Sequence, residues 1–459
     1  MAWVHHGLGL LLVLLLPTVP ASSPGAVIRI NRAALNYVSD VGKAPLQRAL
    51  MVMVPPCLDW SGEMLQAIKI KILDVHVSHL DLKFIADFGL HLMAKANFTI
   101  KVFRIPEPLE LTLPVALTAD AHVAQGPIGT PMISLSTCSP LFSPASVLDG
   151  SNSTSAMLLV LVQKHIKAIL SNKVCLRISN LVQGLNVHLG TLIGLSPVGP
   201  ESQIRYSMVS KPIVTDDYIA LDVNAVFFLL GKPIIPPLAA TSFELPLSVD
   251  TTGAMVSVGL SQQLFNYVLL LLQKAGTLNL DITGDLSSDD NPLNTSVLGQ
   301  FIPEVAQQFP NPMSVVLKVQ LGATPVVMFH THNATMSLQL FVEVLAVSSN
   351  SDFQSLFSLE VAVNLSLQLS VSKVKLQGTT SMLGDIRLAV AASNVGFIDV
   401  KHVHTLVGSL LQKPLLDHLN ALLGMGIALP SVVNLYYNSP EVFVYEGYVV
   451  ISSGLVYQR

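Results

Sequence analysis

The segment from Leu359 to Val371 alternates without interruption between apolar residues and polar or small ones. Every odd position is leucine or valine, and the even positions include Glu360, Asn364 and Gln368. Because successive side chains of a β-strand point to opposite faces, this pattern predicts one apolar and one polar face. The stretch is roughly twice as long as a typical strand of about 5–6 residues. It suits a curled antiparallel sheet with an apolar interior.

The composition is unusually apolar for a chain without a long hydrophobic segment. Hydrophobic residues make up 51% of the 459 residues and charged residues 12%, against roughly 25% charged in an average soluble protein. Beyond the N-terminus, no segment reaches the roughly 18 apolar residues of a membrane-spanning helix, so we expect no transmembrane anchor. The excess of apolar residues fits either a core with an apolar cavity or apolar faces that pack together and leave no pocket, and composition alone does not choose between them.

The N-terminus and five glycosylation sequons indicate export. Residues 8–16 form a short apolar run followed by the small residues Val19 and Ala21, which predicts a signal peptide over residues 1–21. A buried N-terminal helix is the alternative. The sequons predict N-glycosylation of a secreted, extracellular protein. They begin at Asn97, Asn152, Asn294, Asn333 and Asn364. The polar neighbours of Asn97 and Asn364 at alternate positions place both on outward strand faces.

Three cysteines, Cys57, Cys138 and Cys175, allow one disulfide and one remaining thiol. A disulfide is expected in an oxidising compartment. The sequence alone leaves the choice of pair open.

The first half of the chain reads as a helix, a meander of strands and a long helix. Apolar residues recur every three or four positions over 30–41, and a long apolar helix begins near Ala156 and continues past Cys175. Between them, short alternating runs bounded by turn residues predict antiparallel strands. These runs cover 68–72, 80–84, 98–102 and 109–113.

The second half repeats that order about 235–250 residues later. A helix is predicted over 261–274 and a late helix over 403–423, with strands at 315–321, 336–347 and 359–376 between them. Residues 206–250 are rich in proline, which breaks helices and inner strands. The sequence therefore predicts an N-terminal barrel over 22–205, a Pro-rich linker and central-sheet region over 206–250, and a C-terminal barrel over 251–459.

Motifs that carry chemistry are scarce. Gly194-Leu-Ser196 and Gly259-Leu-Ser261 begin like a nucleophile elbow but lack its closing glycine, and Ser261 fits better as a helix N-cap. Two histidine pairs, at 330 and 332 and at 402 and 404, would share one face of a strand and form a conceivable metal site. Solvated surface histidines are the plainer interpretation. We expect no enzymatic activity, no metal and no cofactor.

Charge argues against nucleic acid as a partner. Residues 22–220 hold 16 Lys and Arg against 13 Asp and Glu, so this half is only mildly basic, whereas nucleic-acid binding calls for a strongly basic stripe. A candidate basic cluster is interspersed with Asp74, Asp81, Asp87 and Glu107. It comprises Lys69, Lys71, Lys83, Lys95, Lys101 and Arg104.

Several segments in order resemble the bactericidal/permeability-increasing lipid-binding family. They are PGAVIRI at 24–30, VGLSQQLFN at 258–266 and FIPEVAQQFP at 301–310, and Cys138 and Cys175 match the spacing of the family's single disulfide. The resemblance implies an α+β boomerang of two pseudo-symmetric barrels, each an antiparallel sheet wrapped on long helices, joined by a central sheet. It also implies an apolar pocket in each barrel for a phospholipid-like ligand.

The expected function is therefore that of a secreted lipid-binding protein, with a role in mucosal innate defence. Phospholipid or another acyl-chain lipid is the expected partner, and lipopolysaccharide is a weaker candidate because the strongly basic N-terminal tip of the lipopolysaccharide-binding members is missing. A surface-active protein working through an exposed apolar patch and an esterase with an unrecognised triad are alternatives. The residues expected to line the pockets are Ile70, Ile72, Leu111, Leu113, Leu161, Leu365, Leu367 and Leu369.

Overall fold

The computed structural model describes residues 25–51, 69–103, 109–148, 156–234, 243–246, 253–283, 293–348 and 352–458. The predicted signal peptide, Cys57, Asn152 and Arg104 lie outside these ranges.

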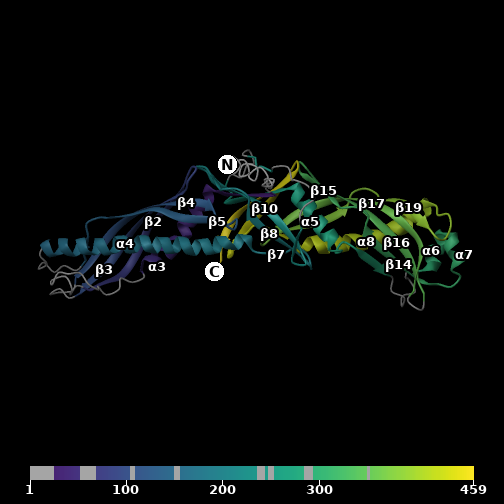
Figure 1. Ribbon diagram of the computed structural model, residues 1–459, viewed down its shortest axis with the longest axis horizontal. Coiled ribbons are helices and arrows are strands. Elements are labelled where there is room, and N and C mark those ends of the chain that lie inside the picture. The colour runs from purple at the N-terminus through teal and green to yellow at the C-terminus, as the bar shows by residue number, and fades with distance from the viewer. Residues whose placement is uncertain are drawn as a thin grey trace, which may run out of the picture.

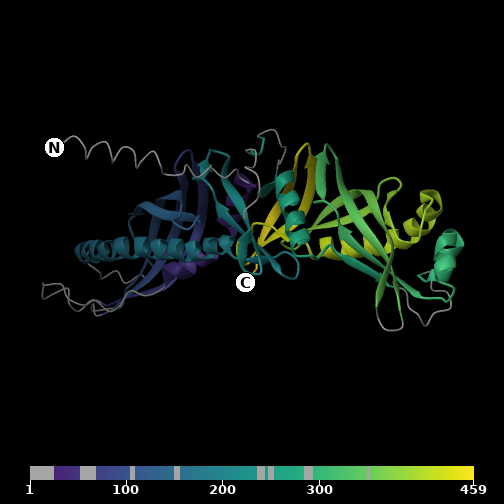
Figure 2. The same cartoon turned by 45° about the vertical axis from the view of Figure 1, so that its right-hand side comes forward.

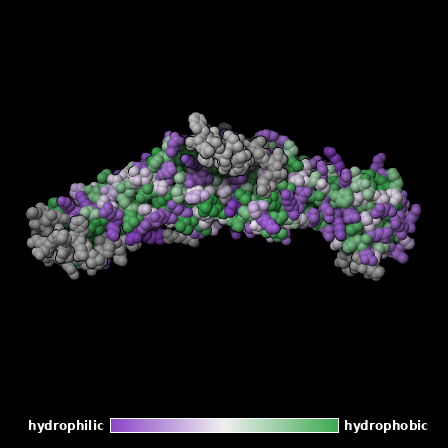
Figure 3. Space-filling model, viewed as in Figure 1, coloured by the Kyte–Doolittle hydropathy of each residue, from purple (hydrophilic) through white to green (hydrophobic). Residues whose placement is uncertain are grey.

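The molecule is an elongated, gently bent body in which two halves flank a central sheet (Figures 1 and 2). The N-terminal half contains a five-stranded sheet, the central part a nine-stranded sheet and the C-terminal half an eight-stranded sheet, and all the strand pairings are antiparallel. Each outer sheet curls into a half-barrel accompanied by one long helix. This α+β boomerang is the expected fold class. Hydrophobic and hydrophilic side chains are interspersed over the face seen in Figure 3.

The N-terminal half is built on strands that the sequence pattern located. One correction is that the run at 80–84 and the described part of the run at 68–72, from Lys69, belong to a single strand, β2, with irregularities after Ile72 and Val77. The helix expected over 30–41 begins only at Arg32, because residues 26–31 form a strand. The elements are β1 Ala26–Asn31, α2 Arg32–Val41, α3 Lys43–Met51, β2 Lys69–Ile85, β3 Gly89–Phe103, β4 Leu109–Gln125, β5 Pro131–Phe142 and β6 Ser146–Val147, followed by α4 Ala156–Leu189 and a 3₁₀ turn, η1, Gly190–Ile193.

The long helix α4 packs on the sheet through a stripe of buried side chains spaced four residues apart. These are Val162, Ile166, Leu170, Val174 and Ile178. Residues at this spacing lie on one face of an α-helix, so a single stripe follows the sheet along its length. Beside this stripe, a disulfide between Cys138 of β5 and Cys175 of α4 joins helix to sheet, with 5.8 Å between the two Cα atoms. This is the pair that the resemblance implied.

The central sheet combines strands from both ends of the chain. Its order is β21-β22-β12-β1-β10-β8-β7, with β9 and β11 also paired to β10. The strand β1 thus lies between β10 and β12, so the start of the chain binds the two halves together. Its members after β1 are β7 Ser196–Pro197, β8 Ser202–Met208, β9 Ile213–Val214, β10 Tyr218–Leu229, β11 Lys232–Ile234, β12 Val256–Ser261, β21 Leu435–Tyr445 and β22 Tyr448–Tyr457. The described part of 206–250 therefore supplies strands of this sheet, and the predicted domain limits stay a prediction.

The C-terminal half repeats the plan of the first. The alternating segment lies in β17, whose odd residues from Leu359 to Leu365 are buried while Glu360 and Asn364 are exposed. The expected strand over 359–376 is divided by a turn at Lys373, where φ is +57°. The elements are α5 Gln262–Lys274, β13 Leu280–Thr283, α6 Thr295–Phe301, α7 Pro303–Gln308, β14 Ser314–Leu321, β15 Val326–His330, β16 Asn333–Val347, β17 Phe353–Ser372, β18 Lys375–Met382, β19 Arg387–Ser393, α8 Val400–Met425 and β20 Ile427–Ala428.

The two longer helices of this half, α5 and α8, begin with side-chain caps. The Ser261 hydroxyl accepts a hydrogen bond from the Leu264 amide at 3.3 Å, as expected for an N-cap. The Asp399 carboxylate caps α8 by accepting from the Lys401 amide at 2.9 Å. The buried side of α8 includes Leu411, Leu415 and Leu419, again four residues apart.

Candidate functional site

An apolar pocket opens in the C-terminal half, where the half-barrel meets the central sheet. It encloses about 580 Å³ of space free of protein atoms, including its opening to solvent. Its walls come from α5, β15 to β18, the last turn of α8, β20 and the turn between β7 and β8.

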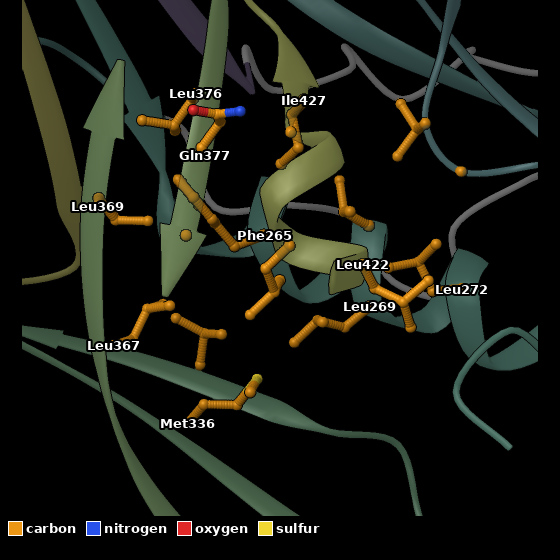
Figure 4. Close-up of a pocket in the computed structure, with 17 residues that line it drawn as sticks. Phe265, Leu269, Leu272, Met336, Leu367, Leu369, Leu376, Gln377, Leu422 and Ile427 are labelled. Carbon is orange, nitrogen blue, oxygen red and sulfur yellow. The ribbon is translucent and has the colours of Figure 1, made fainter. Parts of the chain in front are cut away.

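The lining of the pocket is almost entirely hydrophobic. In the close-up, Met336, Leu367 and Leu369 face Leu269 and Leu422 across the space (Figure 4). Of the 17 lining residues, 13 are apolar, three are glycines and one is Gln377. The lining residues that the structure describes carry no charge, so the pocket favours an uncharged, flexible hydrocarbon over a polar ligand.

The exposure of the lining residues distinguishes the floor of the pocket from its mouth. The floor is formed by buried side chains that include Phe265, Val268 and Met336. The mouth is formed by residues that keep partial contact with solvent, which are Gly199, Leu369, Gln377, Leu422, Leu423, Gly426 and Ile427. The ligand would therefore enter between the β7–β8 turn and the end of α8.

Two glycines shape the pocket, Gly378 in its wall and Gly426 at its mouth. A Cβ on Gly378 would lie 3.2 Å from Cδ1 of Leu367 and 3.5 Å from Cβ of Leu423, so the missing side chain leaves room inside the pocket. Gly426 ends α8 with φ of +71°, and a Cβ there would lie 2.9 Å from the carbonyl oxygen of Leu376. A positive φ at the end of a helix favours glycine. The chain can therefore turn directly from α8 into β20 beside the pocket.

Hydrogen bonds hold the mouth in place. The Gln377 side-chain amide donates to the carbonyl of Gly424 at 2.6 Å, which satisfies one of the last carbonyls of α8. The hydroxyl of Tyr206, on β8, donates to the carbonyl of Ala428 at 2.7 Å. Burial raises the pKa of the Tyr206 hydroxyl far above its ordinary value, so this donor keeps its proton. The central sheet thereby fixes the segment that follows α8.

The residues expected to line lipid pockets divide between the two halves. Leu367 and Leu369 line the C-terminal pocket, whereas Leu365 is fully buried in the adjoining core. In the N-terminal half, Ile70, Leu111 and Leu113 are buried in the cluster around α4, and Ile72 packs against it. Leu161 lies on α4, and its side chain is outside the described set. A pocket in the N-terminal barrel stays a prediction.

The sequence analysis did not predict most of the residues that line the pocket. The lining residues from α5 and α8, such as Leu272 and Leu423, were recognisable only as helical core positions. Gly199, Gly378 and Gly426 carry no periodic signal at all. A possible clue was the position of Gly426 at the predicted end of an apolar helix, which is the usual place for a terminating glycine.

The two histidine pairs do not form the arrangement that the spacing suggested. His330 ends β15, but His332 lies in the following turn with φ of +62°. Positions 402 and 404 lie on α8, which is a helix and not a strand. His330 contacts the Glu446 carboxylate at 3.2 Å, and His404 contacts the carbonyl of Ile386 at 2.7 Å. The expectation of a shared strand face is therefore wrong for both pairs.

Within the described ranges, no group of three His, Cys, Asp or Glu side chains is arranged to hold a metal ion. Among the helices described, none has the length and apolar character needed to cross a bilayer.

The described sequons occupy different settings. Asn97, Asn333 and Asn364 are exposed on or at the end of strands. Asn294 is half-buried, and its side-chain oxygen caps α6 by accepting from the Val297 amide at 2.8 Å. Glycosylation at these positions stays a prediction.

The basic residues of the N-terminal sheet are partly paired with acids. Lys101 contacts Glu110 at 2.7 Å, and Lys83 contacts Asp81 at 3.3 Å. Lys71 and Lys95 are exposed. Pairing at these two positions agrees with a mixed, solvated surface rather than with a single anion-binding cluster.

Comparison with known proteins places this geometry in a family. The N-terminal domain model described as "LBP / BPI / CETP family" matches residues 34–185, and the C-terminal domain model of that family matches 198–457. The chain is 72% identical to human BPI fold-containing family B member 2 over 458 residues, which is 100% of both chains, and 63% identical to the mouse protein over 96% of both. The crystal structure of lipopolysaccharide binding protein matches with a TM-score of 0.62 at 21% identity, covering 95% of this chain and all of that one.

Proposed function

The chain belongs to the LBP / BPI / CETP family, and from that premise we propose that it is a secreted protein that holds the acyl chain of a phospholipid in its C-terminal pocket. The pocket itself is the observation that carries the proposal. Apart from Gln377, its described walls are apolar or glycine, and it is open at one end.

The energetics of an apolar pocket support an acyl chain as its ligand. Each methylene transferred from water to an apolar site contributes about 0.8 kcal/mol. A segment of eight buried methylenes would thus contribute about 6 kcal/mol before the cost of ordering the chain. The uncharged lining leaves the headgroup in solvent at the mouth, where Gln377 is the polar side chain at hand.

Charge favours zwitterionic phospholipid over lipopolysaccharide. Capture of several phosphates requires clustered Lys or Arg side chains. In the described part of the N-terminal sheet, Lys83 and Lys101 are already paired with acids. We therefore expect phosphatidylcholine to bind more tightly than lipopolysaccharide, with little dependence on salt, since screening weakens phosphate capture but not apolar burial.

The test is a direct comparison of the two ligands on the full, secreted protein. Mass spectrometry of lipid extracted from gently purified protein identifies what the pocket carries. Binding of phosphatidylcholine and lipopolysaccharide is then measured at low and physiological salt. Salt-resistant lipopolysaccharide binding without phosphatidylcholine uptake would contradict the proposal.

A surface-active role is the second candidate, because the outer side of α4 exposes apolar side chains. Leu176, Leu185 and Val187 are 53%, 45% and 74% exposed. Exposed apolar patches mark surfaces for adsorption or association. Surface-tension measurement separates the two roles, since a pocket binder lowers surface tension little while retaining co-purified lipid.

A further inference from the structure

We propose that N-linked glycans on Asn333 and Asn364 cover an apolar patch on the outer face of the C-terminal half-barrel and keep the protein from associating with itself through that patch. The inference rests on the secretion that the proposed function includes, because N-glycans belong to exported proteins. It gives the two sequons a task that is separate from the pocket.

The two sequons lie on one face of the sheet. Asn364 on β17 pairs with Ser337 on β16, and Ser337 pairs with Val326 on β15. The Ser337 hydroxyl donates to the side-chain oxygen of Asn364 at 3.0 Å, so the two side chains stand on the same face. Asn333 shares that face, because it is four residues before Ser337 on β16 and successive side chains of a strand alternate.

Exposed apolar side chains flank these sequons. Val326 and Met328 are each 45% exposed while Val327 between them is buried, so β15 turns apolar residues to solvent. Leu383, which is 48% exposed, follows β18, and its amide donates to the carbonyl of Asn364 at 2.9 Å. We call Val326, Met328 and Leu383 the outer patch. Contiguous exposed apolar surface on a soluble protein calls for a cover or a partner.

The free edge of β15 is already covered, so the outward side chains are the part of this strand that stays exposed. The amides of Val327 and Phe329 donate to the side-chain oxygens of Asn266 and Gln262 on α5, both at 2.8 Å. The carbonyl of Phe329 accepts from the Gly447 amide at 3.1 Å. An edge strand with such bonds does not invite pairing with a strand of another chain.

The spacing of the sheet brings the glycans within reach of the outer patch. Neighbouring strands lie about 4.8 Å apart, so Val326 is about 10 Å from Asn364 across β16. Met328 pairs with Thr335, which is two residues or about 7 Å from Asn333 along the strand. Sugar rings on either asparagine can therefore lie over these side chains, with their CH groups on the apolar atoms and their hydroxyls in water.

Glycan attachment requires a lipid-linked oligosaccharide as the sugar donor. The side-chain nitrogen of asparagine forms a bond to C1 of the oligosaccharide, the bond from C1 to the diphosphate of the carrier lipid breaks, and the nitrogen loses one proton. A protein partner fits this face less well, because an interface of about 20–30 residues a side would meet both sequons.

The experiment compares the glycosylated protein, secreted from mammalian cells, with proteins that lack chosen glycans. The variants are Asn333→Gln, Asn364→Gln and the two together. Asn97→Gln is the matched control, because Asn97 is an exposed sequon on a strand and its neighbours on that face include His76 and Lys95. Glycopeptide mapping reports which asparagines carry sugar, and analytical ultracentrifugation reports self-association.

Two further arms keep the test independent of secretion yield and identify the contact surface. Glycans are removed from the folded, unmodified protein with an endoglycosidase, so that no variant has to fold without them. Met328→Gln is added to the double variant to make the outer patch more polar.

We expect glycans on both Asn333 and Asn364. Loss of both, by substitution or by enzyme, should strengthen self-association about tenfold, as follows from the apolar area of two half-exposed side chains. Adding Met328→Gln should reverse most of that increase. Asn97→Gln should associate no more than the unmodified protein does.

The inference would be overturned by a secreted protein without sugar on Asn333 and Asn364, by unchanged self-association after glycan removal, or by an equal effect of Asn97→Gln. An increase that persists undiminished with Met328→Gln would also refute it, because the outer patch would then not be the contact surface. The proposed lipid binding fails separately, if the fully glycosylated protein carries no lipid and takes up no phosphatidylcholine.

Discussion

Filling the pocket from Gly378 should abolish lipid binding while leaving the fold intact. Gly378 lies on β18 with its missing side chain directed toward Leu367 and Leu423, and its backbone is not in the left-handed region. A Gly378→Leu substitution would place four carbon atoms in the space reserved for the ligand. Displacing about four methylenes at roughly 0.8 kcal/mol each costs about 3 kcal/mol of binding free energy. That corresponds to a loss of affinity of more than about a hundredfold.

The stability of the same variant should change little. A Cβ at this position approaches Cδ1 of Leu367 to 3.2 Å, but that atom is the free end of a flexible side chain that borders the pocket. Replacing glycine inside a strand also removes an entropic disadvantage of about 0.5–1 kcal/mol. We therefore expect the free energy of unfolding to stay within about 1 kcal/mol of the original, even after some overpacking.

The assay combines displacement of a fluorescent fatty acid with denaturant unfolding and mass spectrometry of co-purified lipid. Gly322→Leu is the control, because Gly322 is exposed at the end of β14 and a Cβ there meets nothing closer than 3.6 Å. The claim that lipid occupies the space beside Gly378 would be refuted if Gly378→Leu kept its full affinity and its full content of co-purified lipid. It would also be refuted if Gly322→Leu lost affinity and lipid to the same degree.

Other substitutions test the supports of the fold and the site. Replacing Cys138 by serine should lower the free energy of unfolding by about 2–5 kcal/mol and reduce secretion, whereas Cys57→Ser should not, since Cys138 is bonded to Cys175; non-reducing peptide mapping and secretion yield report both effects. Tyr206→Phe should cost about 1–3 kcal/mol in denaturant unfolding, because the buried carbonyl of Ala428 loses its donor; an unchanged unfolding curve would show that water replaces the hydroxyl. Hydrogen bonds from His91 and Thr137 hold the pKa of Asp120 below its ordinary value, so its contribution to stability is present above about pH 3.9 and is lost as the pH falls further. Asp120→Asn should therefore flatten the acid side of the stability profile, and an unchanged profile would count against this.

The periodicity of the sequence correctly predicted those features of the fold that depend only on neighbouring residues along the chain. The alternation through Leu359 and Leu365 predicted which side of β17 is buried, and the polar residue Ser261 marked the start of α5. Such features depend on contacts within a few residues, which a period of two or of 3.6 reports directly. The same reasoning failed for the histidine pairs, because i and i+2 share a face only on a strand, and His402 and His404 lie on a helix.

The tertiary structure decided what depends on distant partners. Residues 30 and 31 were predicted as the start of a helix, yet they end the strand β1, because strands β10 and β12, about two hundred residues away, offer hydrogen bonds on both edges. The pocket likewise gathers residues from Val198 to Ile427. An apolar side chain satisfies the same sequence pattern whether it fills a core or borders a cavity. Only the packing of separate elements determines which of the two it does, since a cavity is the volume that their side chains together fail to fill.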